Sequence, residues 1–393
     1  MPEFEFKDSR RLRAVQDPVI PLIAGLIRAN PGTVSLGQGV VNFSPPPAVY
    51  EKISLFQQDP DNHKYGPVEG LPELRDKISK KLTAENGITT GEALQVVITA
   101  GANMGFLNAL FAITDPGDEV ILPTPYYFNH EMAVTMLNCR PVAVPTDENY
   151  HPDLKRIEKA INARTRAVVT ISPNNPSGAV YPRELLIAVN RLCLKHNVYH
   201  ITDETYEYFT YDGAVHFSPA SLKDSHRHTI SLFSLSKAYG FASWRIGYMV
   251  IPQHLSLAIR KIQDTNLICP PVISQYAAVG ALQAGRDYCD NKMQSILEVR
   301  TQLLKELETV GSRLSFPRSE GAFYAFLRLD TRITAVDMAA RLIENHKVAV
   351  IPGSAFGMER GCYLRVSYGA LDKETAILGI RRLVEGLSEI IGN

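Results

Sequence analysis

The sequence is poor in cysteine, and its five cysteines are widely spaced, with no C-x-x-C pair and no histidine cluster near them. A zinc site or a disulfide framework requires closely patterned cysteines, so we expect neither. We expect no bound metal, and we expect free thiols in a reducing, cytoplasmic environment. The cysteines are Cys139, Cys193, Cys269, Cys289 and Cys362.

A net charge, a membrane-spanning segment and a signal peptide are also missing. The chain has 41 basic and 41 acidic residues, which gives no support for nucleic acid or an anionic membrane as a partner. No apolar run approaches the roughly 20 residues that span a bilayer. Residues 1–15 lack the apolar core of a signal peptide. We therefore expect a cytoplasmic protein that binds neither nucleic acid nor membrane.

Short β-branched segments alternate with segments of helical length between about residues 95 and 251. Most of the short segments are continuously apolar, which is typical of strands covered on both faces. This order favours an α/β fold with a mostly parallel sheet flanked by helices. The predicted strands are 95–100, 118–122, 140–145, 166–172, 198–203, 229–233 and 246–251.

The flanks of this region differ from it in pattern. The first 45 residues are rich in loops, and a long helical stretch is predicted over residues 287–309. We predict a large domain over residues 46–284. We also predict a smaller α+β domain that is built from both chain ends, residues 1–45 and 285–393.

The most informative segment is residues 234–248, SLSKAYGFASWRIGY, which follows a predicted strand. It places Lys237 among serines and small residues, with Arg245 eight residues later. A lysine is the side chain that holds an aldehyde cofactor as a Schiff base. Serine hydroxyls and a guanidinium are suited to a phosphate group. The segment therefore suits a phosphorylated aldehyde cofactor bound at Lys237. Taken alone, it also fits a surface lysine that precedes a structural Arg-Ile-Gly turn.

A second phosphate-binding candidate is the turn Gly101-Ala102-Asn103, which follows the strand 95–100 and opens a predicted helix. A helix N-terminus directs free backbone N–H groups and a positive dipole end towards an anion. Taken alone, the glycine also fits a role in packing. The apolar residues that recur at helical spacing and indicate the helix are Met104, Leu107, Leu110 and Phe111.

Polar residues that suit the ring of such a cofactor also lie at strand ends. Asp203 ends the strand 198–203, and a carboxylate beside a buried pyridine nitrogen keeps that nitrogen protonated. The protonated ring acts as an electron sink. Asn175 and the hydroxyl of Tyr206 are candidates for bonds to the ring's phenolic oxygen. Taken alone, Asp203 also fits a helix cap, and residues 172–178 also fit a simple turn.

Together these motifs resemble a class I aminotransferase of the fold-type I, pyridoxal-phosphate-dependent superfamily, and the resemblance covers almost the whole chain. Their order and spacing match the family's. The matching segments are LGQG (36–39), KYGPVEGLPELR (64–75), the Gly101 turn, PTPYY (123–127), SPNNPSG (172–178), DETYEYF (203–209), residues 234–248, GAFY (321–324), PGSAFG (352–357) and LRVSYG (364–369).

The resemblance implies pyridoxal 5'-phosphate as the cofactor. It implies that Lys237 forms the Schiff base and later moves a proton to or from the substrate's α-carbon. Asp203 matches the partner of the ring nitrogen, Asn175 and Tyr206 match the donors to the phenolic oxygen, and Tyr127 matches the stacking aromatic residue. The positions that match the family's phosphate site are Ala102, Asn103, Ser234, Ser236 and Arg245, beside Gly101.

The resemblance also implies a homodimer with shared active sites. Tyr65 matches a tyrosine that reaches the cofactor phosphate of the neighbouring subunit. Arg365 matches the arginine that binds the substrate α-carboxylate, assisted by Asn175 and the backbone at Gly39. The implied reaction moves the amino group of an L-amino acid to a 2-oxo acid.

The substrate is less defined than the reaction. The helix-opening position is Asn103 and not a lysine, so a basic partner for a distal carboxylate is missing. This disfavours, without excluding, an aspartate aminotransferase, and the segment around Asn42-Phe43 favours aromatic, glutamine-type or broad specificity. A carbon–sulfur β-lyase or an aminocyclopropane-carboxylate synthase remains an alternative, because the same motifs serve these reactions. Aromatic residues near the expected pocket are Tyr65, Tyr126, Tyr127 and Phe356.

Overall fold

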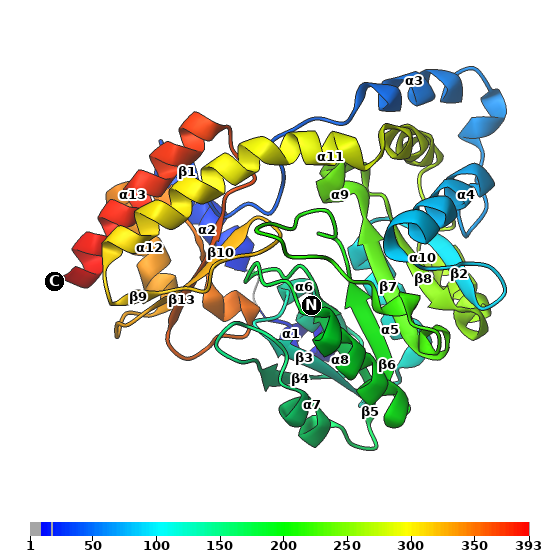
Figure 1. The fold of residues 1–393 in the computed structure, drawn as a ribbon, viewed down its shortest axis with the longest axis horizontal. Coiled ribbons are helices and arrows are strands. Elements are labelled where there is room, and N and C mark those ends of the chain that lie inside the picture. Colours follow the sequence, from blue (N-terminus) through cyan, green and yellow to red (C-terminus); the bar gives the residue numbers. More distant parts are fainter. Residues whose placement is uncertain (1–8, 17–18, 393) are drawn as a thin grey trace, which may run out of the picture.

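The computed structural model describes residues 9–16 and 19–392 and contains a seven-stranded sheet beside a smaller four-stranded one (Figure 1). The large sheet has the order β2-β8-β7-β6-β5-β3-β4, and only β8 runs antiparallel to its neighbours. The predicted mostly parallel α/β fold is confirmed, and each predicted strand lies within two residues of its expected bounds. The strands are β2 (Leu94–Thr99), β3 (Glu119–Thr124), β4 (Arg140–Pro145), β5 (Thr165–Ile171), β6 (Tyr199–Asp203), β7 (Thr229–Ser234) and β8 (Gly247–Pro252).

Helices cover both faces of the large sheet, which explains why its strands are continuously apolar. On β5, Val169 packs with side chains of α5, α6 and α10, whereas its neighbour Val168 packs with those of α7 and α8. The helices are α5 (Ala102–Ile113), α6 (Phe128–Met136), α10 (Ser256–Asn266), α7 (Leu154–Ala160) and α8 (Arg183–Lys195). Successive side chains of one strand thus reach two separate cores.

The predicted helix after the Gly101 turn is present as α5. The helix begins at Ala102 as expected, and Leu110 is buried, but Phe111 is 49% exposed. Phe106 and Ala109 lie against the sheet together with Leu110. The helix packs on β7 and β8.

The four-stranded sheet is antiparallel, with the order β12-β13-β10-β9. Near it, β1 (Val34–Ser35) pairs in parallel with β11 (Val348–Ala349), so residues from the two ends of the chain lie side by side. The strands are β9 (Leu314–Ser315), β10 (Tyr324–Leu329), β12 (Ile351–Pro352) and β13 (Cys362–Ser367). The helices here are α2 (Val19–Ala29), α12 (Ala335–His346) and α13 (Lys373–Gly392), whereas α1 (Arg10–Ala14) packs against α6 of the large sheet.

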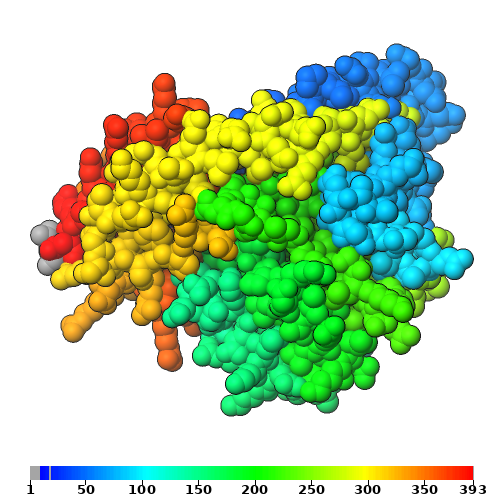
Figure 2. Space-filling model, in the orientation of Figure 1, coloured from blue at the N-terminus to red at the C-terminus, as the bar shows by residue number. Residues whose placement is uncertain are grey.

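The long helix α11 (Val272–Leu307) has two helical parts, and the part after Gly285 agrees with the helix predicted over residues 287–309. The backbone departs from helical geometry at Gly285, where φ is +68°. Before this break α11 packs on α3 (Pro47–Phe56), near α4 (Pro72–Lys81), and after it on α13. The helix therefore lies along the surface and links the two parts of the molecule (Figures 1 and 2). None of the helices in the described ranges is long and apolar enough to cross a membrane.

Candidate active site

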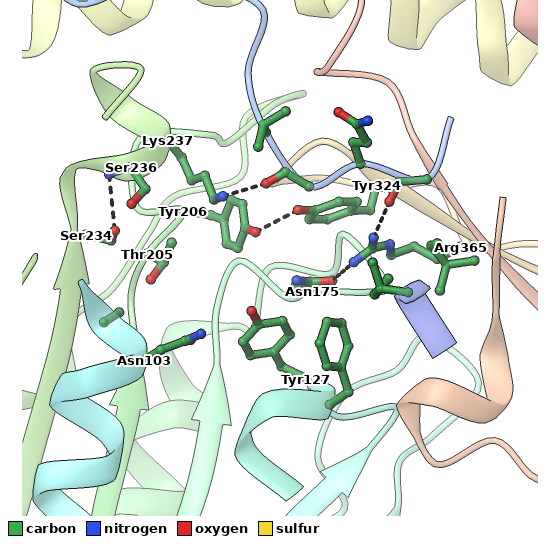
Figure 3. A pocket seen from close by; sticks show the side chains of 18 of the residues that line it. Asn103, Tyr127, Asn175, Thr205, Tyr206, Ser234, Ser236, Lys237, Tyr324 and Arg365 are labelled. Atoms are coloured by element: carbon green, nitrogen blue, oxygen red, sulfur yellow. Dashed lines mark hydrogen bonds between the residues drawn. The ribbon is translucent and has the colours of Figure 1, made fainter. Parts of the chain in front are cut away.

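One cavity of about 480 Å³ lies where the carboxyl ends of the parallel strands meet the smaller sheet and the N-terminal segment (Figure 3). Ligands of α/β sheets bind beyond these strand ends. The predicted site residues that line the cavity are Gly39, Ala102, Asn103, Tyr127, Asn175, Asp203, Tyr206, Ser234, Ser236, Lys237, Arg245 and Arg365. Gly101 directly precedes this lining, whereas Tyr65 lies outside it and is 79% exposed.

Lys237 points into the cavity from the short helix α9 (Leu235–Ala238), which follows β7. The side chain of Ser234 caps this helix by accepting a hydrogen bond from the backbone N–H of Ser236 at 3.1 Å. The Nζ atom of Lys237 donates to the carbonyl of Gly39. Burial lowers the pKa of Lys237 and the nearby cations Arg365 and Arg245 act in the same direction, which together bring it to about 8.

An anion-binding corner is formed by the first turn of α5, the two serines and Arg245. Gly101 is the N-cap residue, with a φ of +82°, and a Cβ atom there would stand 2.5 Å from Nη2 of Arg245. A glycine is therefore needed for the guanidinium to lie against the helix N-terminus. The guanidinium is held by the carbonyl of Ala242 at 2.8 Å. This donor set suits a phosphate group.

Asp203 ends β6 and is held by two donors. Its Oδ1 accepts the backbone N–H of Thr205 at 3.0 Å, and its Oδ2 lies 3.3 Å from Nε2 of His130. Burial raises the pKa of Asp203, but the hydrogen bonds from His130 and Thr205 outweigh it and leave the pKa below its usual value. Asp203 is therefore a carboxylate at neutral pH and suits a protonated ring nitrogen.

Arg365 lies on β13 and is almost fully buried. It donates through Nη1 to Oδ1 of Asn175 at 2.9 Å and through Nη2 to the carbonyl of Gly37 at 2.6 Å. Its Nε atom is buried without a hydrogen-bond partner. A buried guanidinium whose visible partners are all uncharged is suited to bind an anionic group such as a carboxylate.

Aromatic residues enclose the middle of the cavity. Tyr127, the residue before α6, packs edge-on against His130 with a centroid distance of 5.3 Å, and burial raises its pKa. The hydroxyls of Tyr206 and Tyr324 lie 2.7 Å apart. The cavity thus has a cationic amine and carboxylate at one side, an anion corner at another, and a flat aromatic boundary.

The prediction from sequence missed three groups that contact predicted site residues. His130 is the partner of Asp203, Tyr324 contacts Tyr206 and Arg365, and the carbonyl of Gly37 binds Arg365. Tyr324 lies in the segment GAFY, which the resemblance includes without a role. His130 carried a weak signal, since it lies three residues after Tyr127 on a helix beginning at Phe128.

The chain matches the family model "Aminotransferase class I and II" over residues 31–383. This match covers most of the sequence. The chain belongs to the class I and II aminotransferases. The resemblance inferred from the motifs is therefore confirmed, and this aminotransferase depends on pyridoxal 5'-phosphate. It transfers an amino group from an amino acid to a 2-oxo acid.

Named relatives support the same conclusion. The aminotransferase is 35% identical to the aromatic aminotransferase ISS1 of Arabidopsis thaliana, over 98% of this chain and 97% of the relative. It is 33% identical to the aspartate/prephenate aminotransferase of Thermus thermophilus, over 98% of both chains. The solved aspartate aminotransferase of Thermus thermophilus with maleate is 32% identical, with a TM-score of 0.89 over 97% of this chain and 100% of that chain.

The residues of the cavity fit pyridoxal 5'-phosphate. The anion-binding corner, where Gly101 lets Arg245 lie against the N-terminus of α5, suits the phosphate. Asp203 suits the ring nitrogen. Lys237 has the amine that such an aldehyde requires. When bound, the cofactor supplies the electron sink of the reaction.

The lowered pKa of Lys237 predicts how the apoenzyme takes up its cofactor. Only the neutral amine attacks the aldehyde, and a pKa of about 8 makes about a tenth of it neutral at pH 7. The rate of attachment should therefore rise with pH and level off above about pH 8, well below the ordinary 10.5. The measurement is stopped-flow absorbance, with borohydride reduction and peptide mapping to identify the lysine.

Two variants control this experiment. Lys237→Ala should give no fixed cofactor on any other lysine. Arg365→Gln removes a cation that lowers the pKa of Lys237, so its midpoint should move upward. A wild-type midpoint near 10.5, or a label on another lysine, would contradict the description of this site.

Proposed function

We propose that Lys237 carries the cofactor and moves the proton at the substrate's α-carbon, with Arg365 as the clamp for the α-carboxylate. The observation that carries this proposal is that both cations line one cavity that also contains the anion corner at Gly101 and Arg245. An amine with a lowered pKa is a suitable proton acceptor near neutral pH. Arg365 offers a planar pair of donors to the carboxylate that all amino and 2-oxo acids share.

The remaining roles concern the cofactor. Asp203 would hold the ring nitrogen protonated, and Asn175 and Tyr206 would donate to the phenolic oxygen. Tyr127 would stack on the ring. The phosphate would be held at Gly101, Ala102, Asn103, Ser234, Ser236 and Arg245. Gly39 would meet the substrate carboxylate through its backbone, next to the Gly37 carbonyl that binds Arg365.

The proposed amino donor is an aromatic or glutamine-type amino acid, within a broad specificity. The wall beyond Arg365 is apolar, with Ile20 and Ile23 of α2 and Phe128 of α6. Among the described lining residues, Lys237, Arg245 and Arg365 are the only lysines or arginines. A distal carboxylate would thus lack a cation of its own within this chain, and leaving it unpaired is costly. The relatives are named for aromatic substrates, aspartate and prephenate.

Amino-donor profiling tests this proposal. The purified holoenzyme should convert phenylalanine, tyrosine or glutamine at least ten times more efficiently than aspartate, with equal amounts of 2-oxo acid and new amino acid formed. An enzyme that prefers aspartate would contradict the proposed pocket. Release of pyruvate and ammonia from a cysteine conjugate, without a 2-oxo acceptor, would instead indicate the β-lyase alternative.

The role of Arg365 is tested by Arg365→Lys, which keeps the charge and loses the two-pronged geometry. The KM for the amino acid and the KM for the 2-oxo acid should both rise about 10- to 100-fold. The matched control is Arg360→Lys at an exposed position five residues earlier, which should change neither value. An increase for only one of the two substrates would contradict a shared clamp.

We also propose a homodimer in which Tyr65 acts in the partner's site. Tyr65 is not among the lining residues of its own cavity and is exposed, in a loop after the 3-10 helix η1 (Pro60–His63). The next residue, Gly66, donates its backbone N–H to Sγ of Cys269 at 3.3 Å, beside the exposed side chains of Ile268 and Ile273. An exposed apolar patch of this kind suits an interface between subunits.

Hybrid dimers test the role of Tyr65. Co-expression with two affinity tags yields dimers of a Lys237→Ala subunit and a Tyr65→Asp subunit, each inactive alone, since a carboxylate repels the phosphate. If Tyr65 acts in the partner's site, the intact Lys237 meets an intact Tyr65, so the hybrid should recover up to half of the wild-type activity. An inactive hybrid would place Tyr65 in its own subunit's site, and an active Tyr65→Asp homodimer would place it outside any site.

We propose further that residues 46–284 form the large domain and residues 1–45 and 285–393 the small one. The pairing of β1 with β11 supports this division, although residues 1–8, 17–18 and 393 lie outside the described parts. We also propose a cytoplasmic location, which the five cysteines support, since each is a free thiol in the structure.

A further inference from the structure

Tyr324 occupies the first position of β10 and is completely buried at the floor of the cavity. Its hydroxyl lies 2.7 Å from the hydroxyl of Tyr206 (Figure 3). Burial raises the pKa of Tyr324 to about 12 and raises that of Tyr206 well above its usual value. Both side chains therefore keep their protons at neutral pH, and one of the two hydroxyls donates to the other.

The ring of Tyr324 also contacts the carboxylate clamp. The guanidinium carbon of Arg365 lies 4.7 Å from the centroid of the Tyr324 ring and 5.0 Å from that of Phe356. Aromatic contacts of this kind orient a planar guanidinium and stabilise its charge. The hydrogen bonds of Arg365 to Asn175 and Gly37 also help to orient the guanidinium plane.

A third contact connects Tyr324 to the N-terminal segment that closes the cavity. A Cβ atom at Gly39 would stand 2.7 Å from the Tyr324 hydroxyl, so this backbone passes directly over it. The carbonyl of Gly39 accepts the hydrogen bond from Lys237. The Tyr324 side chain thus lies next to Gly39, which binds Lys237, and contacts both Arg365 and Tyr206.

We propose that Tyr324 is a positioning residue of the active site: its hydroxyl donates to Tyr206, and its ring orients Arg365. The proposal rests on the roles proposed above for Tyr206 and Arg365. With the cofactor bound, the proton of Tyr206 is directed to the phenolic oxygen, so Tyr206 must accept from Tyr324. Donors arranged in such a chain strengthen one another.

This arrangement predicts a spectroscopic effect in the resting holoenzyme. Without the Tyr324 hydroxyl, Tyr206 is a weaker donor, and more negative charge stays on the phenolic oxygen. That negative charge favours the protonated form of the nitrogen that joins Lys237 to the cofactor. The pH midpoint at which the cofactor's visible absorption changes therefore moves upward. The charged groups facing Lys237 are Arg365, Arg245 and Asp203, and the variant changes none of them.

The test compares Tyr324→Phe with Tyr368→Phe. Tyr368 is an equally buried tyrosine outside the cavity lining, and its hydroxyl lies 3.3 Å from Oγ of Ser319. Tyr324→Phe should raise the absorption midpoint by about 0.3 to 1 pH unit, with the KM values changed less than threefold. Tyr368→Phe should leave the midpoint unchanged. An unshifted midpoint in folded Tyr324→Phe would overturn the proposal.

A double variant shows whether Tyr324 acts through Tyr206. Tyr206→Phe should raise the midpoint more than Tyr324→Phe, and Tyr206→Phe/Tyr324→Phe should have the midpoint of Tyr206→Phe alone. Additive shifts would overturn the proposal while leaving the role of Tyr206 intact. No shift in Tyr206→Phe would overturn the role of Tyr206 and, with it, the role of Tyr324.

Tyr324→Leu tests the contact between the ring and Arg365. Loss of the ring should raise the KM of the amino acid and of the 2-oxo acid at least fivefold beyond the values for Tyr324→Phe. Thermal unfolding of each holoenzyme verifies that the variants are folded. Equal KM values in Tyr324→Phe and folded Tyr324→Leu would overturn this part of the proposal.

Discussion

Three cations face one cavity, and the surrounding structure compensates for the burial of two of them, Lys237 and Arg365. Lys237 and Arg365 are both largely removed from water, and each is held by uncharged oxygen atoms. Since carbonyl and amide groups satisfy hydrogen bonds without neutralising charge, the cations still repel one another. This repulsion adds to desolvation in lowering the pKa of Lys237. A single arrangement thus keeps the lysine usable as a base and leaves the arginine able to bind an anion.

The topology of the sheet places these groups. Asp203, Ser234 and Asn175 follow strands that run in the same direction, so their side chains meet at one edge. Arg365 and Tyr324 come instead from paired strands of the smaller sheet, where Arg365 lies opposite Phe326. The N-terminal segment contacts both groups, with Gly37 bound to Arg365 and Gly39 bound to Lys237. The cavity is therefore complete only when three distant parts of the chain are folded together.

The sequence predicted the large sheet, and it indicated candidate cofactor-binding residues that line one cavity, because both carry local signals. Apolar strands, the Gly101 turn and the segment around Lys237 each carry their own pattern. The part of α11 before Gly285 was not predicted, and this part packs on α3, which is distant in sequence. His130 and Tyr324 were missed because their partners lie 73 and 118 residues away in sequence, respectively, and no spacing rule links them.

The charge of the lining gives a physical reason for the choice of ligands. Within the described residues, Lys237, Arg245 and Arg365 face the cavity and Asp203 is the only carboxylate among its lining residues. Asp203 is already held by His130 and Thr205, so it neutralises the cations only in part. A phosphate and an α-carboxylate would bring the missing negative charge. The phosphate and the α-carboxylate are present in every turnover, so the positive charge of the cavity favours the parts that all substrates share. Discrimination between substrate side chains therefore depends on the apolar wall formed by α2 and Phe128.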